Sequence, residues 1–286
     1  MLTPWLEISD CAESISRWSE VIGKDLVALG TTADADEIRD TANAQPLIVA
    51  TGLIAANLLG VSAPVISGHS VGEITAAAVA KVFSEFDAMR FVNDRANAMA
   101  KAASLEKTGM SAVLGGDREE VLDAILKLGL VAANDNGTGQ IVAAGLISEL
   151  SLFADNPPVG ARIRPLAVAG AFHTRYMQSA QEVLAKSAAT ISPSDPTGSI
   201  ISNRDGFAVV DGEEVLERII SQVASPVRWD LCMKSLQELG VTGVIELAPA
   251  GTLVGLLKRA TPEIETFAFK SPADLAAASE FAEKHK

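Results

Sequence analysis

The sequence predicts an α/β fold: a mostly parallel sheet covered by helices, with a small α+β subdomain inserted into it. In both outer parts of the chain, short apolar runs alternate with helical patterns, and this order favours parallel strands with helices on both faces. In the middle, the predicted order becomes strand, helix, strand, strand, helix, strand, which is typical of a ferredoxin-like unit. We therefore expect a core formed by residues 1–107 and 169–286, and an inserted subdomain formed by residues 108–168.

The first part of the core is predicted to be mostly helical. One short apolar run, Ala63–Ser67, predicts a buried strand, and apolar residues recur at helical spacing around it. Ser84 followed by Asp87 resembles a capping box at the start of the last helix. The predicted helices are 10–22, 46–59, 71–81 and 84–103.

The inserted subdomain is predicted from shorter segments. Asn134-Asp135-Asn136-Gly137 supplies turn residues between its two middle strands. The predicted strands are 110–114, 130–133, 141–144 and 162–168, and the predicted helices are 118–127 and 147–153.

Alternation resumes in the last part of the chain. Strands are predicted at 199–202, 244–247 and 266–269, and helices at 175–190, 212–223, 230–239, 252–259 and 272–283.

Composition excludes several classes of function. The 286 residues are 48% hydrophobic, which argues against disorder, and the formal net charge of −13 argues against binding to nucleic acid or anionic membranes. The two cysteines, Cys11 and Cys232, lack the spacing of a metal or redox site, so we expect no metal and a reducing cytoplasm.

One stretch could be taken for a membrane span, because no charged side chain lies between Asp40 and Glu73. Pro46, Gly60 and Pro64 interrupt it. We interpret it as a buried helix followed by a buried strand.

The pentapeptide Gly68-His69-Ser70-Val71-Gly72 lies between the predicted strand 63–67 and a predicted helix. In that context a G-x-S-x-G sequence places a serine hydroxyl on a tight turn above the sheet, where the next backbone N–H can stabilise an oxyanion. The pattern alone is weak, because a glycine-flanked serine often caps a helix.

A serine nucleophile needs a base, and histidine is the usual one. His285 lies in a charged tail, and His69 adjoins Ser70 on the turn. His173, which precedes a predicted helix, therefore remains as the base; its alternative role is a bond to the backbone at the start of that helix.

Two polar residues occupy apolar helical faces. Arg95 follows Phe91 and Val92 at the spacing of a buried stripe, so it either forms a structural salt bridge or binds a substrate carboxylate. Gln222 shares a face with Ile219, and it either caps its own helix or holds a histidine in the correct tautomer.

Together these segments resemble the malonyl-CoA:acyl carrier protein transacylases, from Met1 to about Asp274. Gly68-His69-Ser70-Val71-Gly72-Glu73 resembles the family's G-H-S-x-G-E motif, and Gly170-Ala171-Phe172-His173 resembles the segment with its catalytic histidine. Arg95 and Gln222 also fall at family positions. The resemblance implies a hydrolase-like α/β core around the inserted subdomain.

The resemblance further implies roles for residues. Ser70, His173 and Gln222 would be catalytic, with Gln222 orienting the histidine. Arg95, His69, Val71 and Phe172 would bind substrate; a phenylalanine before the histidine accompanies a preference for malonyl over methylmalonyl groups in related enzymes.

The implied activity is transfer of a malonyl group from malonyl-CoA to the phosphopantetheine thiol of acyl carrier protein, through a malonyl-serine and without a cofactor. We expect a monomer whose partners are acyl carrier protein and CoA, not nucleic acid or a membrane. The alternatives are a serine esterase or thioesterase, and a degenerate protein that only binds acyl carrier protein.

One family feature does not occur in this sequence. Family members open with an apolar strand and a G-Q-G-x-Q loop that lends an N–H to the oxyanion hole, and this sequence contains no G-Q-G-x-Q. We expect a start codon assigned too late or a truncated start. The Val71 N–H is then the one donor of that pair present in the sequence.

Overall fold

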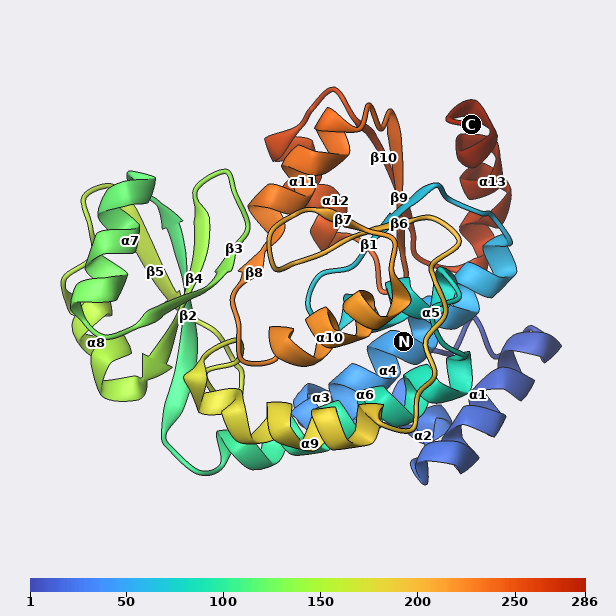
Figure 1. Ribbon diagram of the computed structural model, residues 1–286, viewed down its shortest axis with the longest axis horizontal. Helices are drawn as coiled ribbons and strands as arrows, with labels where there is room; N and C mark the ends of the chain where they lie inside the picture. The colour runs from blue at the N-terminus through green and yellow to red at the C-terminus, as the bar shows by residue number, and fades with distance from the viewer.

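The computed structural model describes residues 1–286 and divides into a helix-rich core and a smaller sheet-and-helix unit, drawn in green at the left of Figure 1. The first third of the chain is almost entirely helical. Its helices are α1 (Ser9–Ile22), α2 (Leu26–Thr31), α3 (Ala35–Arg39), α4 (Thr41–Leu59), α5 (Gly72–Val79) and α6 (Glu85–Ala103).

Three aspartates start helices that the sequence analysis missed or placed late. Asp25 and Asp34 cap α2 and α3, which are too short to show an apolar period. Asp40 accepts a hydrogen bond from the Ala42 N–H and starts α4 at Thr41, not at residue 46, so Pro46 lies inside the helix.

Helix α4 is the centre of the core. Its length and hydropathy would suffice to cross a membrane, but more than half of its residues are buried by neighbouring elements, including α1, α5 and α6. We therefore interpret it as a core helix. The largest cluster of buried apolar side chains, 39 residues, surrounds it.

The core contains two short sheets where one mostly parallel sheet was expected. In the first, β1 (Val65–Ser67) pairs in parallel with β6 (Ser199–Ile201), and β7 (Ala208–Val209) pairs antiparallel with β6. In the second, β9 (Gly243–Leu247) and β10 (Glu265–Phe269) are parallel. The pairings are mostly parallel, as expected, with β7 folded back as the one antiparallel strand after a tight turn in which Gly206 has φ 76°. The expectation of a single sheet was wrong, because no ladder joins the two sheets.

The smaller unit has the predicted order of elements. It contains β2 (Thr108–Gly115), α7 (Arg118–Lys127), β3 (Val131–Asp135), β4 (Gln140–Leu146), α8 (Ile147–Asp155) and β5 (Ala161–Pro165). The strand order is β5-β2-β4-β3, with antiparallel neighbours. A fifth strand, β8 (Val227–Arg228), comes from outside the range 108–168 and pairs in parallel with β3.

The remaining helices cover the core. They are η1 (Arg175–Met177), α9 (Gln178–Ala188), α10 (Gly212–Gln222), α11 (Trp229–Glu238), α12 (Thr252–Ala260), η2 (Pro272–Asp274) and α13 (Leu275–Lys284). Helix α9 packs along α6, and Figure 1 shows the two lying side by side below the sheets. The loop before η1 carries His173, and α10 ends on Gln222.

Candidate active site

The turn between β1 and α5 presents Ser70. This residue has φ 54°, in the left-handed region that is uncommon for a side chain other than glycine. A Cβ on Gly68 would lie 2.1 Å from the carbonyl carbon and oxygen of Gly72, so the turn can form only with glycine at position 68. A Cβ on Gly72 would meet nothing within 4 Å. Only the first glycine of the motif is thus required by the fold of the turn.

The structure brings Ser70 and His173 together across 103 positions of sequence. The Ser70 Oγ lies 2.8 Å from the His173 Nε2. The His173 Nδ1 lies 3.0 Å from the backbone carbonyl oxygen of Gln222, which can only accept a hydrogen bond, so we assign the proton to Nδ1. Nε2 is then free to accept the proton of the Ser70 hydroxyl.

His173 is 4% exposed, and its surroundings disfavour the charged form. Burial, and then the nearby charge of Arg95, lower the pKa of His173 to about 3, against a smaller opposing effect of the bond to Gln222. The imidazole is therefore neutral at physiological pH, as a general base must be.

Arg95 lies 1% exposed on α6, and its guanidinium reaches the nucleophile. Its Nη2 donates to the Ser70 Oγ at 3.2 Å and to the Gln222 Oε1 at 3.0 Å, and its Nη1 donates to the Gln45 Oε1 at 2.5 Å. No carboxylate lies within salt-bridge distance. The structural salt bridge is therefore absent, and a buried cation beside Ser70 has only neutral partners.

Burial lowers the pKa of Arg95 to about 10, and the charge of Glu73 opposes that shift. The guanidinium consequently stays charged at neutral pH. Its charge is not neutralised by direct contact, and this favours an anionic ligand at this position.

Gln222 has two separate functions in the network. Its backbone carbonyl holds His173, and its side-chain Nε2 donates to the Glu73 Oε2 at 2.6 Å and to the Ser70 carbonyl oxygen at 3.1 Å. The side chain does not cap its own helix.

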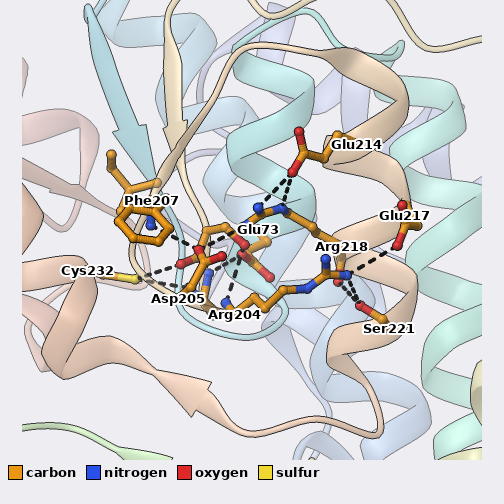
Figure 2. Close-up of polar contacts among 12 residues, drawn as sticks. Glu73, Arg204, Asp205, Phe207, Glu214, Glu217, Arg218, Ser221 and Cys232 are labelled. Atoms are coloured by element: carbon orange, nitrogen blue, oxygen red, sulfur yellow. Dashed lines mark hydrogen bonds and ion pairs between the residues drawn. The ribbon is translucent and has the colours of Figure 1, made fainter.

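Glu73 is a buried carboxyl that the sequence analysis quoted in the motif but gave no role. Burial raises the pKa of Glu73 to about 7, while hydrogen bonds from Asn203 and Gln222 and the charges of Arg95 and Arg218 act in the opposite direction. Figure 2 shows Glu73 with Cys232 on one side and Arg218 on the other.

Two further residues, Gln45 and Asn203, were missed entirely. Gln45 on α4 holds Arg95, and Asn203 after β6 contacts both sides of the Ser70 turn. Single buried amides leave no pattern in a sequence. Only their positions in the folded chain identify them.

The other three residues named from the sequence lie around this network. The Val71 N–H, next to Ser70, has no acceptor in the chain, as an oxyanion donor requires. His69 is bound to the Asn136 Oδ1 through Nε2 at 3.0 Å and packs edge-on against Trp229. Phe172 is partly buried and packs against both the main core and a small apolar cluster formed mostly by strand residues of the smaller unit.

The chain is similar to known proteins both in sequence and in structure. A family model described as the acyl transferase domain matches residues 8–277. The malonyl CoA-acyl carrier protein transacylase of Mycolicibacterium smegmatis is 49% identical, over 96% of this chain and 98% of its own length. The crystal structure of MCAT from Mycobacterium tuberculosis has a TM-score of 0.94 at 47% identity, covering 97% of this chain and 94% of that one.

A third similar protein was solved with a partner. It is a malonyl-transacylase in complex with a type II PKS acyl-carrier protein, with a TM-score of 0.92 at 26% identity, covering 98% of this chain and 94% of that one. Both the sequence match and the structural match extend over nearly the whole chain. The chain therefore belongs to the acyl transferase family, among the malonyl CoA-acyl carrier protein transacylases.

Proposed function

We propose that this chain transfers the malonyl group of malonyl-CoA to the phosphopantetheine thiol of acyl carrier protein through a malonyl ester of Ser70. The names of its relatives support both substrates, and the complex of the related malonyl-transacylase supports the carrier protein as partner. The observation that carries the proposal is Arg95, a buried cation without a carboxylate partner, 3.2 Å from the Ser70 Oγ. In a malonyl group one CH₂ separates the free carboxylate from the thioester carbonyl, so a cation next to the nucleophile can bind the carboxylate while Ser70 attacks the carbonyl.

In the first half-reaction, His173 takes the hydroxyl proton as the Ser70 Oγ attacks the thioester carbonyl carbon. The Val71 N–H donates to the oxygen that becomes negative. When the C–S bond breaks, the imidazolium of His173 returns its proton to the departing CoA thiolate. Malonyl-Ser70 and free CoA result.

In the second half-reaction, the thiol of the carrier's phosphopantetheine attacks the ester carbonyl, and His173 takes the thiol proton. The C–O bond to Ser70 breaks, and the proton passes to the Ser70 oxygen. Arg95 holds the malonyl carboxylate in both steps through paired hydrogen bonds. Gln222 keeps His173 in the required tautomer, and Phe172 and His69 border the acyl group.

The fold supports a finer description of the two parts. We assign residues 108–168 to a ferredoxin-like subdomain, and its strand order β5-β2-β4-β3 with helices α7 and α8 supports this. We assign residues 1–107 and 169–286 to a hydrolase-like core. Its strand–Ser70–helix turn supports that assignment.

Acid–base catalysis by Ser70 and His173, with Arg95 binding the carboxylate, needs no cofactor or metal. We propose a monomer, because Ser70, His173 and Arg95 contact one another within one chain and the proposed chemistry requires no residue from a second copy. The absence of paired cysteine spacing supports a cytoplasmic location. The net charge of −13 supports the absence of nucleic acid and anionic membranes among the partners.

The test is a covalent adduct. Incubated with malonyl-CoA, the protein should gain the mass of one malonyl group, and Ser70→Ala should gain none. Addition of holo acyl carrier protein should remove the adduct and yield malonyl-carrier. An adduct that persists in Ser70→Ala would place the nucleophile elsewhere, and rapid loss of the adduct to water without a carrier would identify a hydrolase.

A further inference from the structure

Asn203 is a fully buried side chain next to the nucleophile, and both its amide nitrogen and its amide oxygen are hydrogen-bonded. It is 0% exposed and follows β6 by two residues. Its Nδ2 donates to the Gly68 carbonyl oxygen at 2.7 Å, and its Oδ1 accepts from the Ser70 N–H at 2.7 Å. One amide thus binds the backbone on both sides of His69, at the entry to the turn.

These two bonds take the place of the backbone hydrogen bonds between β1 and β6, which end just before Gly68. Strands β1 and β6 are paired as far as Ser67 and Ile201, and beyond Ser67 the chain leaves the sheet to form the turn. A side-chain amide has the same donor and acceptor as a peptide group. Asn203 therefore continues the pairing by one step with its side chain, where the backbone of β1 can no longer follow.

The backbone of Asn203 is itself fixed, so the side chain has a defined direction. The Asn203 N–H donates to the Glu73 Oε1 at 2.7 Å, and its carbonyl accepts from the Arg228 N–H at 2.8 Å. The Gln222 Nε2 makes a longer contact, 3.3 Å, to the Asn203 Oδ1. This arrangement depends on three elements: α5 through Glu73, β8 through Arg228, and α10 through Gln222.

The bond to Ser70 also decides which N–H groups can meet an oxyanion. The Ser70 N–H is occupied by the Asn203 Oδ1, whereas the Val71 N–H has no acceptor in the chain. Ser70 has φ 54°, a conformation that persists only where surrounding contacts impose it.

We propose that Asn203 is a positioning residue for malonyl transfer: it holds the Ser70 turn in its left-handed conformation and aims both the Ser70 Oγ at His173 and the Val71 N–H at the oxyanion. The inference rests on Ser70 being the nucleophile, which the Ser70→Ala adduct experiment tests separately. Asn203 acts through the turn and does not contact substrate.

The experiment measures single-turnover malonylation of the protein at several malonyl-CoA concentrations. Asn203→Ala should lower the maximal acylation rate about 100-fold, because a small misplacement of a nucleophile has effects on that order. The concentration for half-maximal rate should stay close to that of the wild type. Arg95 is held by Gln45 and Gln222 and not by Asn203, so binding of the malonyl carboxylate is preserved.

Asn203→Asp provides a second variant of nearly the same size. It keeps an acceptor for the Ser70 N–H but, when ionised, has no donor for the Gly68 carbonyl. It should therefore also acylate more slowly, by about 10-fold or more on the same argument, with little change in the half-maximal concentration. This variant decides the question if Asn203→Ala does not fold.

Cys232→Ala is the matched control. Cys232 is equally buried, and its Sγ lies 3.7 Å from the Asn203 Nδ2, yet it bonds neither Gly68 nor Ser70. It should lower the melting temperature without lowering the acylation rate of the folded protein. A folded Asn203 variant that acylates as fast as the wild type, or faster because the Ser70 N–H has become free, overturns the proposal.

Discussion

At the residue scale, burial sets the charges of the site in a consistent way. His173 loses affinity for its proton, Glu73 gains it, and Arg95 keeps its charge because its pKa falls only to about 10. At neutral pH the space around Ser70 therefore holds a neutral base and one cation. That combination suits a substrate that carries one carboxylate and is attacked at another carbon.

Arg95→Ala should separate carboxylate binding from acyl transfer. The variant should lower kcat/KM for malonyl-CoA by about 100-fold or more, because a charge-assisted bidentate contact is worth on the order of 3 kcal/mol. Acetyl-CoA has no free carboxylate, so its slower transfer should fall much less. The measurement is kcat/KM for both thioesters.

Arg90→Ala is the control on the same helix. Arg90 is 62% exposed and pairs only with Asp87, so neither thioester should be affected. Equal losses for malonyl-CoA and acetyl-CoA in Arg95→Ala would contradict the role of Arg95 as the carboxylate-binding residue.

Glu73 and His173 should give the stability of the protein opposite pH dependences. The pKa of Glu73 is raised from 4.5 to about 7, so the folded state retains a proton that the unfolded state loses, and stability falls as pH rises through this window. The pKa of His173 is lowered from 6.5 to about 3, so stability rises as pH rises from 3 to 6.5. In the wild type the two slopes oppose each other between pH 4.5 and 6.5.

Glu73→Gln should therefore expose the slope of His173. Between pH 5 and 6.5 its free energy of unfolding should rise by about 1–2 kcal/mol relative to the wild type, because one proton is worth about 1.4 kcal/mol per pH unit. His173→Ala should shift in the opposite direction. Urea unfolding at the two pH values measures both; parallel curves for all three proteins would contradict the assignment.

At the element scale, the turn between β1 and α5 shows which part of a motif is structural. Gly68→Ala should prevent the native turn, because its Cβ would overlap the backbone of Gly72, and we expect a loss of stability of several kcal/mol or no folded protein. Gly72→Ala should keep or raise stability by up to about 1 kcal/mol, because alanine is the better helix former and the site is open. Thermal unfolding of the two variants provides the comparison, and equal losses would refute this account of the turn.

The elements that could be predicted were those with a long apolar period or a clear cap. Helix 118–127 was predicted at both ends, and α6 was placed within one residue by Ser84. The strands β7 and β8 were missed because two residues have no periodicity and pair only through distant partners. The predicted helix 175–190 is a 3-10 turn followed by α9. The turn is fixed by a hydrogen bond from the Tyr176 N–H to the Thr174 side chain, and hydrophobic periodicity gives no sign of such a bond.

The sequence predicted the reactive and charged side chains of the site, but not the amide side chains that hold them in place. Ser70 lies in a G-x-S-x-G motif, and His173 is the histidine that remained when the other two were set aside. Arg95 and Gln222 are polar residues at apolar helical spacing, so the sequence pointed to all four. Gln45 and Asn203 are common amides whose importance comes from contacts made across 50 and 133 positions. Which oxygen of Gln222 holds the histidine also depended on the folded geometry.

At the scale of the whole molecule, the two parts have separate hydrophobic cores of unequal size. The core around α4 contains 39 buried residues, whereas the sheet and helices of the smaller unit enclose 9. A small core gives less stability, so the smaller unit should open first. Hydrogen exchange should be faster in the amides of β2–β5 than in those of α4 and α6, and equal protection of both would contradict this view.

Arg95 has a consequence for how the enzyme meets its ligand. The molecule as a whole carries a formal charge of −13, and the guanidinium that we propose binds the substrate carboxylate is buried inside it. At a salt concentration of 0.1 M the electric field of Arg95 is screened over about 10 Å. An approaching anion is therefore repelled by the net negative charge of the protein before it can be attracted by Arg95. We therefore expect selection for a carboxylate to depend on its fit against Arg95 inside the site, and not on long-range electrostatic attraction.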